Sequence, residues 1–156
     1  MASPDWNHLN PELLSRIKTQ LGSEFDEFAK TCEEIGLLSS NFLPINKELS
    51  TLSTFDARLA CFLCASAVVS AANHYGNQSN LDMARHLAVW ALALEPSHVP
   101  ALMCLAGVHQ LEGNEQDMTE CYQKCEAIKK RIMNTPDSDL EAYERGLLRV
   151  FQAGLS

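Results

Sequence analysis

Residues of similar size and character recur at a spacing of 34 positions along the middle of the chain. The aligned pairs are Val68 with Leu102, Ala72 with Ala106, Tyr75 with His109, Ala84 with Met118, Ala88 with Tyr122 and Ala91 with Cys125. A fixed period of this length is typical of repeat proteins, in which each unit buries its apolar face against the next. Small residues on one face let antiparallel helices approach closely, while larger ones fill the groove between neighbouring pairs. The recurrence therefore predicts stacked helical hairpins.

Composition and periodicity predict an all-α fold throughout. The chain is rich in Leu, Ala and Glu, which favour helix, and no segment alternates with the period of a strand. With 156 residues, 46% of them hydrophobic, it has the length and composition of one globular domain, residues 1–156.

The helix signals divide this domain into four parts. Asn10 as a cap, followed by Pro11, opens an N-terminal helical hairpin at 10–35. A Ser/Asn/Pro-rich connector at 36–53 follows, and the repeat region covers 54–132. A capping helix at 137–153 closes the array, as the exposed end of a repeat stack requires.

The N-terminal hairpin has apolar partners available in the repeat region. We expect it either to pack on Phe55, Leu59 and Phe62 and close the array, or to be a divergent repeat. We expect the connector to pack against the rest of the chain through Phe42, Leu43 and Leu49.

Two prolines mark the boundary between the units, in the stretch LALEPSHVPALMCLAG. Proline is costly inside a helix but is tolerated in the first turn, where its missing N–H has no helical partner. Pro96 is therefore expected to help stop one helix, and Pro100 to lie in the first turn of the next.

These residues resemble the tetratricopeptide repeat (TPR), with two degenerate TPR-like units at 65–98 and 99–132. The matching positions are Val68, Ala71, Ala72, Tyr75, Ala84, Ala91 and Pro96 in the first unit, and Leu102, Leu105, Ala106, His109, Gly113, Tyr122 and Cys125 in the second. The departures are Ser79 for the turn glycine, Ala88 for the second aromatic residue, Met118 for an alanine and Lys130 for the final proline. The resemblance implies an antiparallel helix-hairpin solenoid.

The resemblance also implies a concave groove, lined by the first helix of each unit, that takes a peptide or helix of a partner protein. The implied lining residues are Ser66, Val69, Asn73 and Asn77 from the first unit, with Met103, Gly107 and Gln110 from the second. The clamp with which some family members grip a chain terminus needs cations near Val69 and further along, and only Asn73 fits it. We therefore expect recognition through apolar side chains and amides.

Charge and motifs exclude several classes of function. A net charge of −8 and a pI near 5.0 disfavour binding to nucleic acid or to anionic membranes. The N-terminus lacks the features of a signal peptide, and no apolar run approaches the length of a membrane span, so we expect a cytoplasmic protein. Phosphate loops, nucleophile elbows and metalloprotease pairs are absent, which predicts a non-enzymatic protein without a cofactor.

Cys61 and Cys64 form a CxxC motif, which in other settings binds zinc or carries redox chemistry. Here the motif lies inside an apolar helix without a glycine or a basic neighbour to lower a thiol pKa. Buried cysteine packs as a small hydrophobic residue, so core packing is the preferred interpretation and no metal site is expected.

The leading hypothesis is a protein-interaction module, such as an adaptor or small chaperone. Its size, low pI and lack of enzyme motifs resemble the small acidic repeat chaperones of bacterial type III secretion, although no residue motif singles them out. The alternative is a homodimer whose groove is filled by a second copy or by the chain's own Trp6, Phe42 and Leu43. A zinc or redox protein using Cys61 and Cys64 is the lesser alternative.

Overall fold

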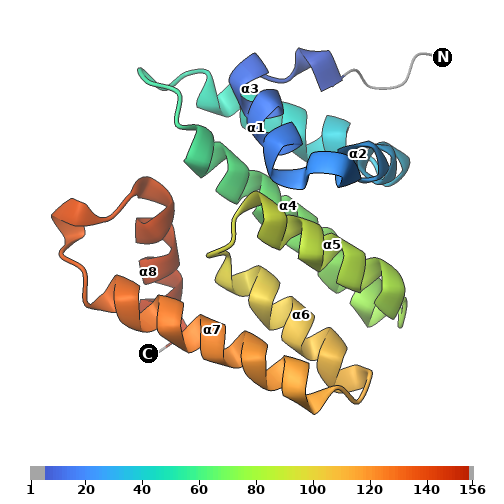
Figure 1. Ribbon diagram of the computed structural model, residues 1–156. Helices are drawn as coiled ribbons and strands as arrows, with labels where there is room; N and C mark the ends of the chain where they lie inside the picture. The colour runs from blue at the N-terminus through green and yellow to red at the C-terminus, as the bar shows by residue number, and fades with distance from the viewer. Residues whose placement is uncertain (1–5, 155–156) are drawn as a thin grey trace.

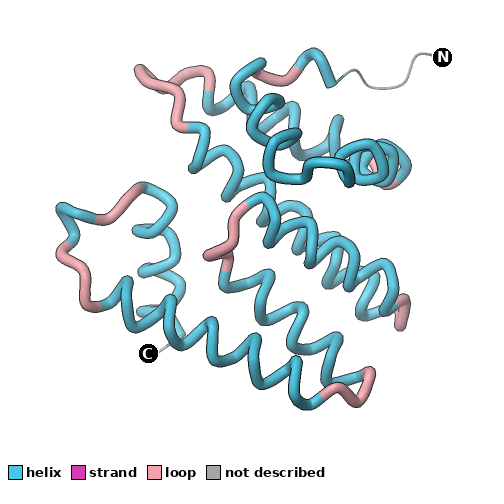
Figure 2. The backbone as a smooth tube through the Cα atoms, in the orientation of Figure 1, coloured by secondary structure: helices cyan, strands magenta, loops and turns pink. Residues whose placement is uncertain are grey.

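The structure is a computed structural model that describes residues 6–154. All regular structure in this range is helical, which confirms the all-α prediction (Figure 2). The α-helices are α1 (Pro11–Leu21), α2 (Phe25–Glu34), α3 (Leu43–Leu49), α4 (Ala57–Asn77), α5 (Leu81–Leu94), α6 (Val99–Leu111), α7 (Glu115–Met133) and α8 (Ala142–Gly154). Short 3-10 turns lie at Trp6–His8, Gly22–Glu24 and Asp137–Asp139, and a π-helical turn at Leu38–Phe42.

Two antiparallel hairpins form the centre of the molecule. Helix α4 pairs with α5 and α6 pairs with α7, and the two hairpins stack through contacts of α6 with both α4 and α5 (Figure 1). This is the stacking of helical hairpins that the 34-residue recurrence predicts. Helices α1 and α2 cover the α4–α5 hairpin on the side away from α6.

The turns of the two hairpins have the same local geometry at positions 34 residues apart, Ser79 and Gly113. Both adopt left-handed backbone, with φ of 63° at Ser79 and 78° at Gly113. The next residues, Asn80 and Asn114, cap α5 and α7 by accepting N–H groups from the first turn of each helix. Their own N–H groups donate to Tyr75 O at 2.9 Å and to His109 O at 2.8 Å, again at equivalent positions. The repeat in the sequence is thus a repeat in backbone structure.

The junction between the hairpins buries two polar side chains, Glu95 and His98. Glu95 accepts a hydrogen bond from the backbone N–H of Ser97 at 3.1 Å and pairs with Arg58 at 3.3 Å. His98 caps α6, accepting the N–H of Ala101 at its Nδ1 atom, and Pro100 lies in the first turn as predicted. The chain stops one helix at Leu94 and restarts the next at Val99 through these buried contacts.

The segment 36–53 differs from the expected irregular connector, because most of it is helical. The π-helical turn Leu38–Phe42 leads directly into α3, with Pro44 in its first turn, where proline costs little. The three residues expected to pack against the rest of the chain do so: Phe42 and Leu49 are buried, and Leu43 is half-buried. The Ser and Asn residues of this segment favoured a connector in the prediction, whereas burial of its apolar residues stabilises a helix.

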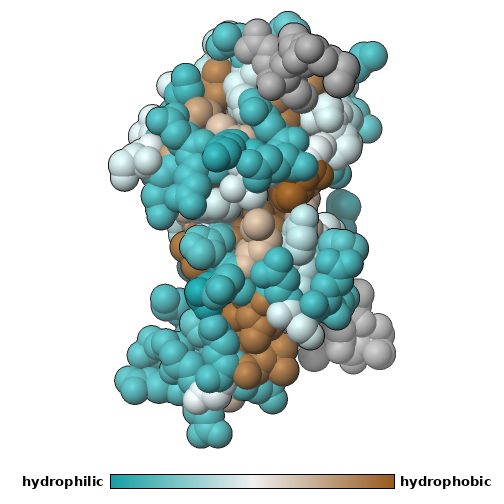
Figure 3. Space-filling model, turned by 90° about the vertical axis from the view of Figure 1, so that its right-hand side faces the viewer, coloured by the Kyte–Doolittle hydropathy of each residue, from teal (hydrophilic) through white to brown (hydrophobic). Residues whose placement is uncertain are grey.

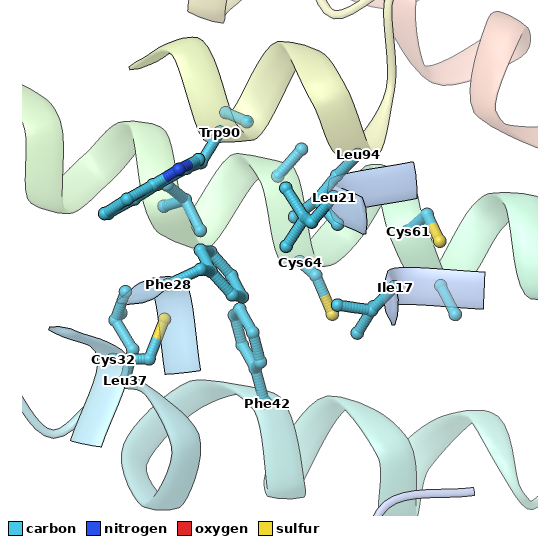
Figure 4. Close-up of a cluster of buried hydrophobic side chains, with 14 of the residues drawn as sticks. Ile17, Leu21, Phe28, Cys32, Leu37, Phe42, Cys61, Cys64, Trp90 and Leu94 are labelled. Atoms are coloured by element: carbon cyan, nitrogen blue, oxygen red, sulfur yellow. The ribbon is translucent and has the colours of Figure 1, made fainter. Parts of the chain in front are cut away.

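The main core joins this segment to α1, α2, α4 and α5 (Figure 4). Phe28 lies at its centre, with ring centroids 6.2 Å from Phe42 and 5.5 Å from Trp90. Trp6 packs against the same rings, 5.9 Å from Phe42. Phe55 and Leu59 pack on this core, as expected for an N-terminal hairpin that covers the end of the array.

Helix α8 turns back beside the end of α7 and contacts both α7 and α4 (Figure 1). It packs with α7 and the beginning of α6 around a second core that contains Val99, Leu102, Ile132, Leu147 and Phe151. Phe62 belongs to this second core and not to the N-terminal hairpin, so its expected packing partner was wrong. The predicted capping helix exists, but it begins after the Asp137–Asp139 turn.

Helix α4 is long and apolar enough to cross a membrane by length and composition alone, which the sequence analysis missed. One such helix is weak evidence for a span, because the core helix of a globular protein passes the same test. Here Ala60, Cys64, Val68 and Ala72 on this helix are all buried. Their burial against α1, α5 and α6 accounts for its apolar composition.

Candidate functional site

A hollow of about 330 Å³ lies between α4 and α6, over the beginning of α5. We call it the α4–α6 groove, and its lining residues are Ala72, Asn73, Gly76, Asn77, Leu81, Ala84, Met103, Cys104, Gly107, Val108, Gln110 and Leu111. Five of the seven residues predicted from the sequence are in this set: Asn73, Asn77, Met103, Gly107 and Gln110. The fold therefore brings these five together at one place.

The other two predicted residues, Ser66 and Val69, do not line the groove. Val69 is buried in the main core with 4% of its surface exposed, so its side chain contributes to packing. The Ser66 hydroxyl donates to Phe62 O at 3.1 Å and lies 2.8 Å from His98 Nε2. Both residues have the helical spacing of the lining residues, but Val69 packs in the core and Ser66 lies against the buried His98.

Two large apolar side chains of α6 are exposed beside the groove. Met103 exposes 48% of its surface and Leu111 exposes 69%. Figure 3 looks at the side of the molecule that carries the α4–α5 and α6–α7 turns, and its lower half shows an apolar patch among hydrophilic residues. Leu111 was not among the predicted lining residues, although its spacing of four from Gly107 places it on the face that Met103 and Gly107 share.

Gly107 lies between these side chains in the middle of α6. A Cβ atom placed there would meet no atom within 4 Å, so close packing inside the chain does not require glycine. Glycine at a helix interior costs about 0.5–1 kcal/mol relative to alanine. The φ of this residue is not positive, so backbone conformation does not require glycine either.

The polar lining of the groove is uncharged, in the part of the chain that the structure describes. Asn73 and Asn77 of α4 and Gln110 of α6 supply amide groups, and all three are exposed. Just outside the groove, Arg85 bridges α5 to the end of α6 by pairing with Asp82 at 2.8 Å and with Glu112. The groove thus offers apolar contact and amide hydrogen bonds, as expected from the sequence.

The residues proposed to plug the groove lie elsewhere. Trp6 and Phe42 pack with Phe28 in the main core, and Leu43 packs against the same core. None of the three lines the α4–α6 groove. From Trp6 onward, the described part of the N-terminal segment therefore does not fill the groove.

Ser66 and His98 are close enough to suggest a nucleophile and a base, but the hydrogen bonds argue otherwise. His98 Nδ1 accepts the N–H of Ala101 at 3.1 Å, which leaves the proton of a neutral ring on Nε2. Nε2 then donates to Ser66 and cannot accept its proton. Burial lowers the pKa of His98 to about 4, which keeps the ring neutral near pH 7. The pair is a structural one.

The CxxC cysteines lie in the main core, as the packing interpretation predicted. Cys61 and Cys64 are both buried, and burial raises the pKa of Cys61 to about 11 and raises that of Cys64 as well. Thiolate is the form that binds metal or attacks a disulfide, so raised pKa values disfavour both roles. Among the described residues there is no group of three or more His, Cys, Asp or Glu side chains placed to hold a metal ion.

Compared with known proteins, the chain matches no family model, no curated protein and no solved structure. The resemblance to the tetratricopeptide repeat accordingly stays a proposal.

Proposed function

We propose that this protein is a non-enzymatic interaction module of TPR-like architecture, which binds an apolar peptide or helix of a partner protein in the α4–α6 groove. The observation that carries the proposal is Gly107, whose missing side chain leaves open space between two exposed apolar residues. Glycine there lowers the stability of α6 without an internal reason, and a close-fitting partner would supply one.

The surroundings of Gly107 fit this use. Met103 offers a flexible, polarizable side chain of the kind common at adaptable binding surfaces. The amides of Asn73, Asn77 and Gln110 can donate to and accept from a partner backbone or side chains. Because the described lining carries no charge, the contacts in the groove would be apolar packing and amide hydrogen bonds.

We assign the module to the cytoplasm on the state of its cysteines. All six are free thiols, and five of them are buried. Free thiols in this number are typical of a reducing compartment. This assignment is part of the proposal, and localisation of the protein in cells would test it.

The test compares proteins captured from the source cells by wild type, Met103→Arg and Asn73→Ala. Arginine at 103 places a charge over the apolar part of the groove, whereas alanine at 73 removes one amide. Val89→Arg is the matched control, because Val89 is also an exposed apolar helix residue, with 44% exposure, and does not line the groove.

We expect Met103→Arg to lose a specific partner that wild type and Val89→Arg retain, with Asn73→Ala giving partial loss. If all four proteins capture the same set, the groove is not the binding site. Sedimentation of the same proteins identifies a second copy as the partner, if wild type dimerises and Met103→Arg does not.

A further inference from the structure

Helix α8 is held by a stripe of apolar residues spaced four apart. Tyr143, Leu147 and Phe151 expose 2%, 0% and 9% of their surfaces. This is the spacing with which an amphipathic helix presents one face to a groove. The stripe contacts Phe62 of α4 and packs in one cluster with Val99 of α6.

Phe62 on α4 and Val99 on α6 lie near the beginnings of the two helix faces that line the α4–α6 groove further along. On α4, the positions Phe62, Ser66, Asn73 and Asn77 follow one another at helical spacing, and on α6 Val99, Met103, Gly107 and Leu111 do so. Helix α8 covers these faces at Phe62 and Val99, near the Pro96 junction, and the open groove lies further along the same two helices. From Phe62 to Asn77 the rise is about 22 Å, the length of a helix of about 15 residues.

Charge complements the apolar stripe at the covered end. Glu144 of α8 accepts a hydrogen bond from Arg131 of α7 at 2.6 Å, and Glu141 lies 3.5 Å from Arg58 of α4. The Arg58 guanidinium also lies over the ring of Tyr143, 4.4 Å from its centroid. The covered end of the groove therefore accepts a helix that carries acidic residues beside its apolar stripe.

The packing of the α4–α5 hairpin against the N-terminal helices does not depend on α8. Helix α8 follows α7 through a non-α-helical segment at 134–141 that contains Pro136, and it is the last described helix. The main core, which holds α4 and α5 together with the N-terminal helices, contains no residue of α8.

We propose, resting on the function proposed above, that α8 is an internal ligand of this groove and that the partner displaces it. The partner segment is then an acidic amphipathic helix of about 15 residues with apolar side chains at positions i, i+4 and i+8. Bound along the full length, it replaces Tyr143 and Leu147 over Phe62 and extends past Met103 to Gly107.

The test uses the full chain and a fluorescein-labelled peptide of residues 137–154, with binding followed by fluorescence anisotropy. Wild type is compared with Leu147→Asp and Tyr143→Ala, which weaken the seating of the chain's own α8. Tyr122→Ala is the matched control, since Tyr122 is 38% exposed on α7 and lies outside the cluster around α8. A peptide carrying Leu147→Asp controls for nonspecific adhesion.

We expect the peptide to bind Leu147→Asp and Tyr143→Ala at least tenfold more tightly than wild type or Tyr122→Ala. The control peptide should bind none of them. If circular dichroism shows that Leu147→Asp has lost the fold, Tyr143→Ala decides the matter. Equal affinity for wild type and Tyr143→Ala, or no binding to either, overturns displacement.

The two proposals fail separately. Loss of partner capture by Met103→Arg without tighter peptide binding by Tyr143→Ala keeps the groove as binding site and refutes release of α8. Tighter peptide binding by Tyr143→Ala with unchanged capture by Met103→Arg keeps the release of α8 and refutes the groove as the partner's binding site.

Discussion

His98 should make the stability of this protein fall with mild acid. The ring is fully buried, and both nitrogens are committed: Nδ1 accepts the N–H of Ala101 and Nε2 contacts Ser66. Protonation of Nδ1 removes the cap of α6 and places a charge beside the ring of Phe62, whose centroid is 4.8 Å away. Acid therefore opposes the folded state at this residue.

The magnitude follows from the two pKa values. Burial lowers the pKa of His98 from 6.5 to about 4, so the unfolded chain binds the proton first as the pH falls. The stability that this neutral ring contributes is complete above the unfolded pKa of 6.5 and is lost as the pH falls toward the folded value. From pH 7 to pH 5 the linkage relation gives a loss of about 2 kcal/mol in the free energy of unfolding.

The assay is urea unfolding of wild type and His98→Asn at pH 7 and pH 5. Asparagine is a good N-cap and does not titrate, so the variant keeps the cap acceptor but lacks the proton equilibrium. We expect wild type to lose about 2 kcal/mol more than the variant between the two pH values. An equal loss in both proteins would refute the buried, neutral assignment of His98.

Three further predictions concern single positions. Ser79→Gly should raise the free energy of unfolding by about 1 kcal/mol in urea titration, because Ser79 has a φ of 63° and glycine carries no side-chain penalty there; unchanged or lower stability would contradict this. Gly107→Ala should raise it by about 0.5–1 kcal/mol, since the added Cβ meets open space, while weakening partner capture; a destabilised variant would show that the site is crowded. Arg131→Ala should increase hydrogen exchange in α8 but not in α5, because Glu144 loses its 2.6 Å partner; equal exchange in both proteins would show that the pair does not hold α8.

Local signals predicted the central helices well, because each helix has its own start and stop residues. Helix α5 ends at Leu94, just before Pro96, the residue that was expected to help stop it. The junction at Pro96 and Pro100 also lies where the prolines indicate. The segment 36–53 was missed because its helix is stabilised by contacts far along the chain, which local composition does not encode.

The candidate groove was predicted in outline from a resemblance, and the structure redistributed its residues. Asn73, Asn77 and Gly107 line one hollow, but Val69 is turned into the core and Ser66 toward His98. Val69 and Asn73 are four residues apart and lie on nearly the same face of α4, yet one is buried and the other lines the groove; this difference appears only when the neighbouring helices are placed. The packing of α8 against Phe62 could not be predicted either, because local sequence does not specify which of several apolar faces a terminal helix covers.

If a partner lies against α6 at Gly107, photo-crosslinking from the groove should capture it. A benzophenone amino acid replaces Gln110 on the rim of the groove or, in the control protein, the exposed Val89. We expect an adduct in irradiated cells from position 110, absent from position 89 and lost when Met103→Arg is added. The same adducts from both positions, or none from position 110, would contradict it.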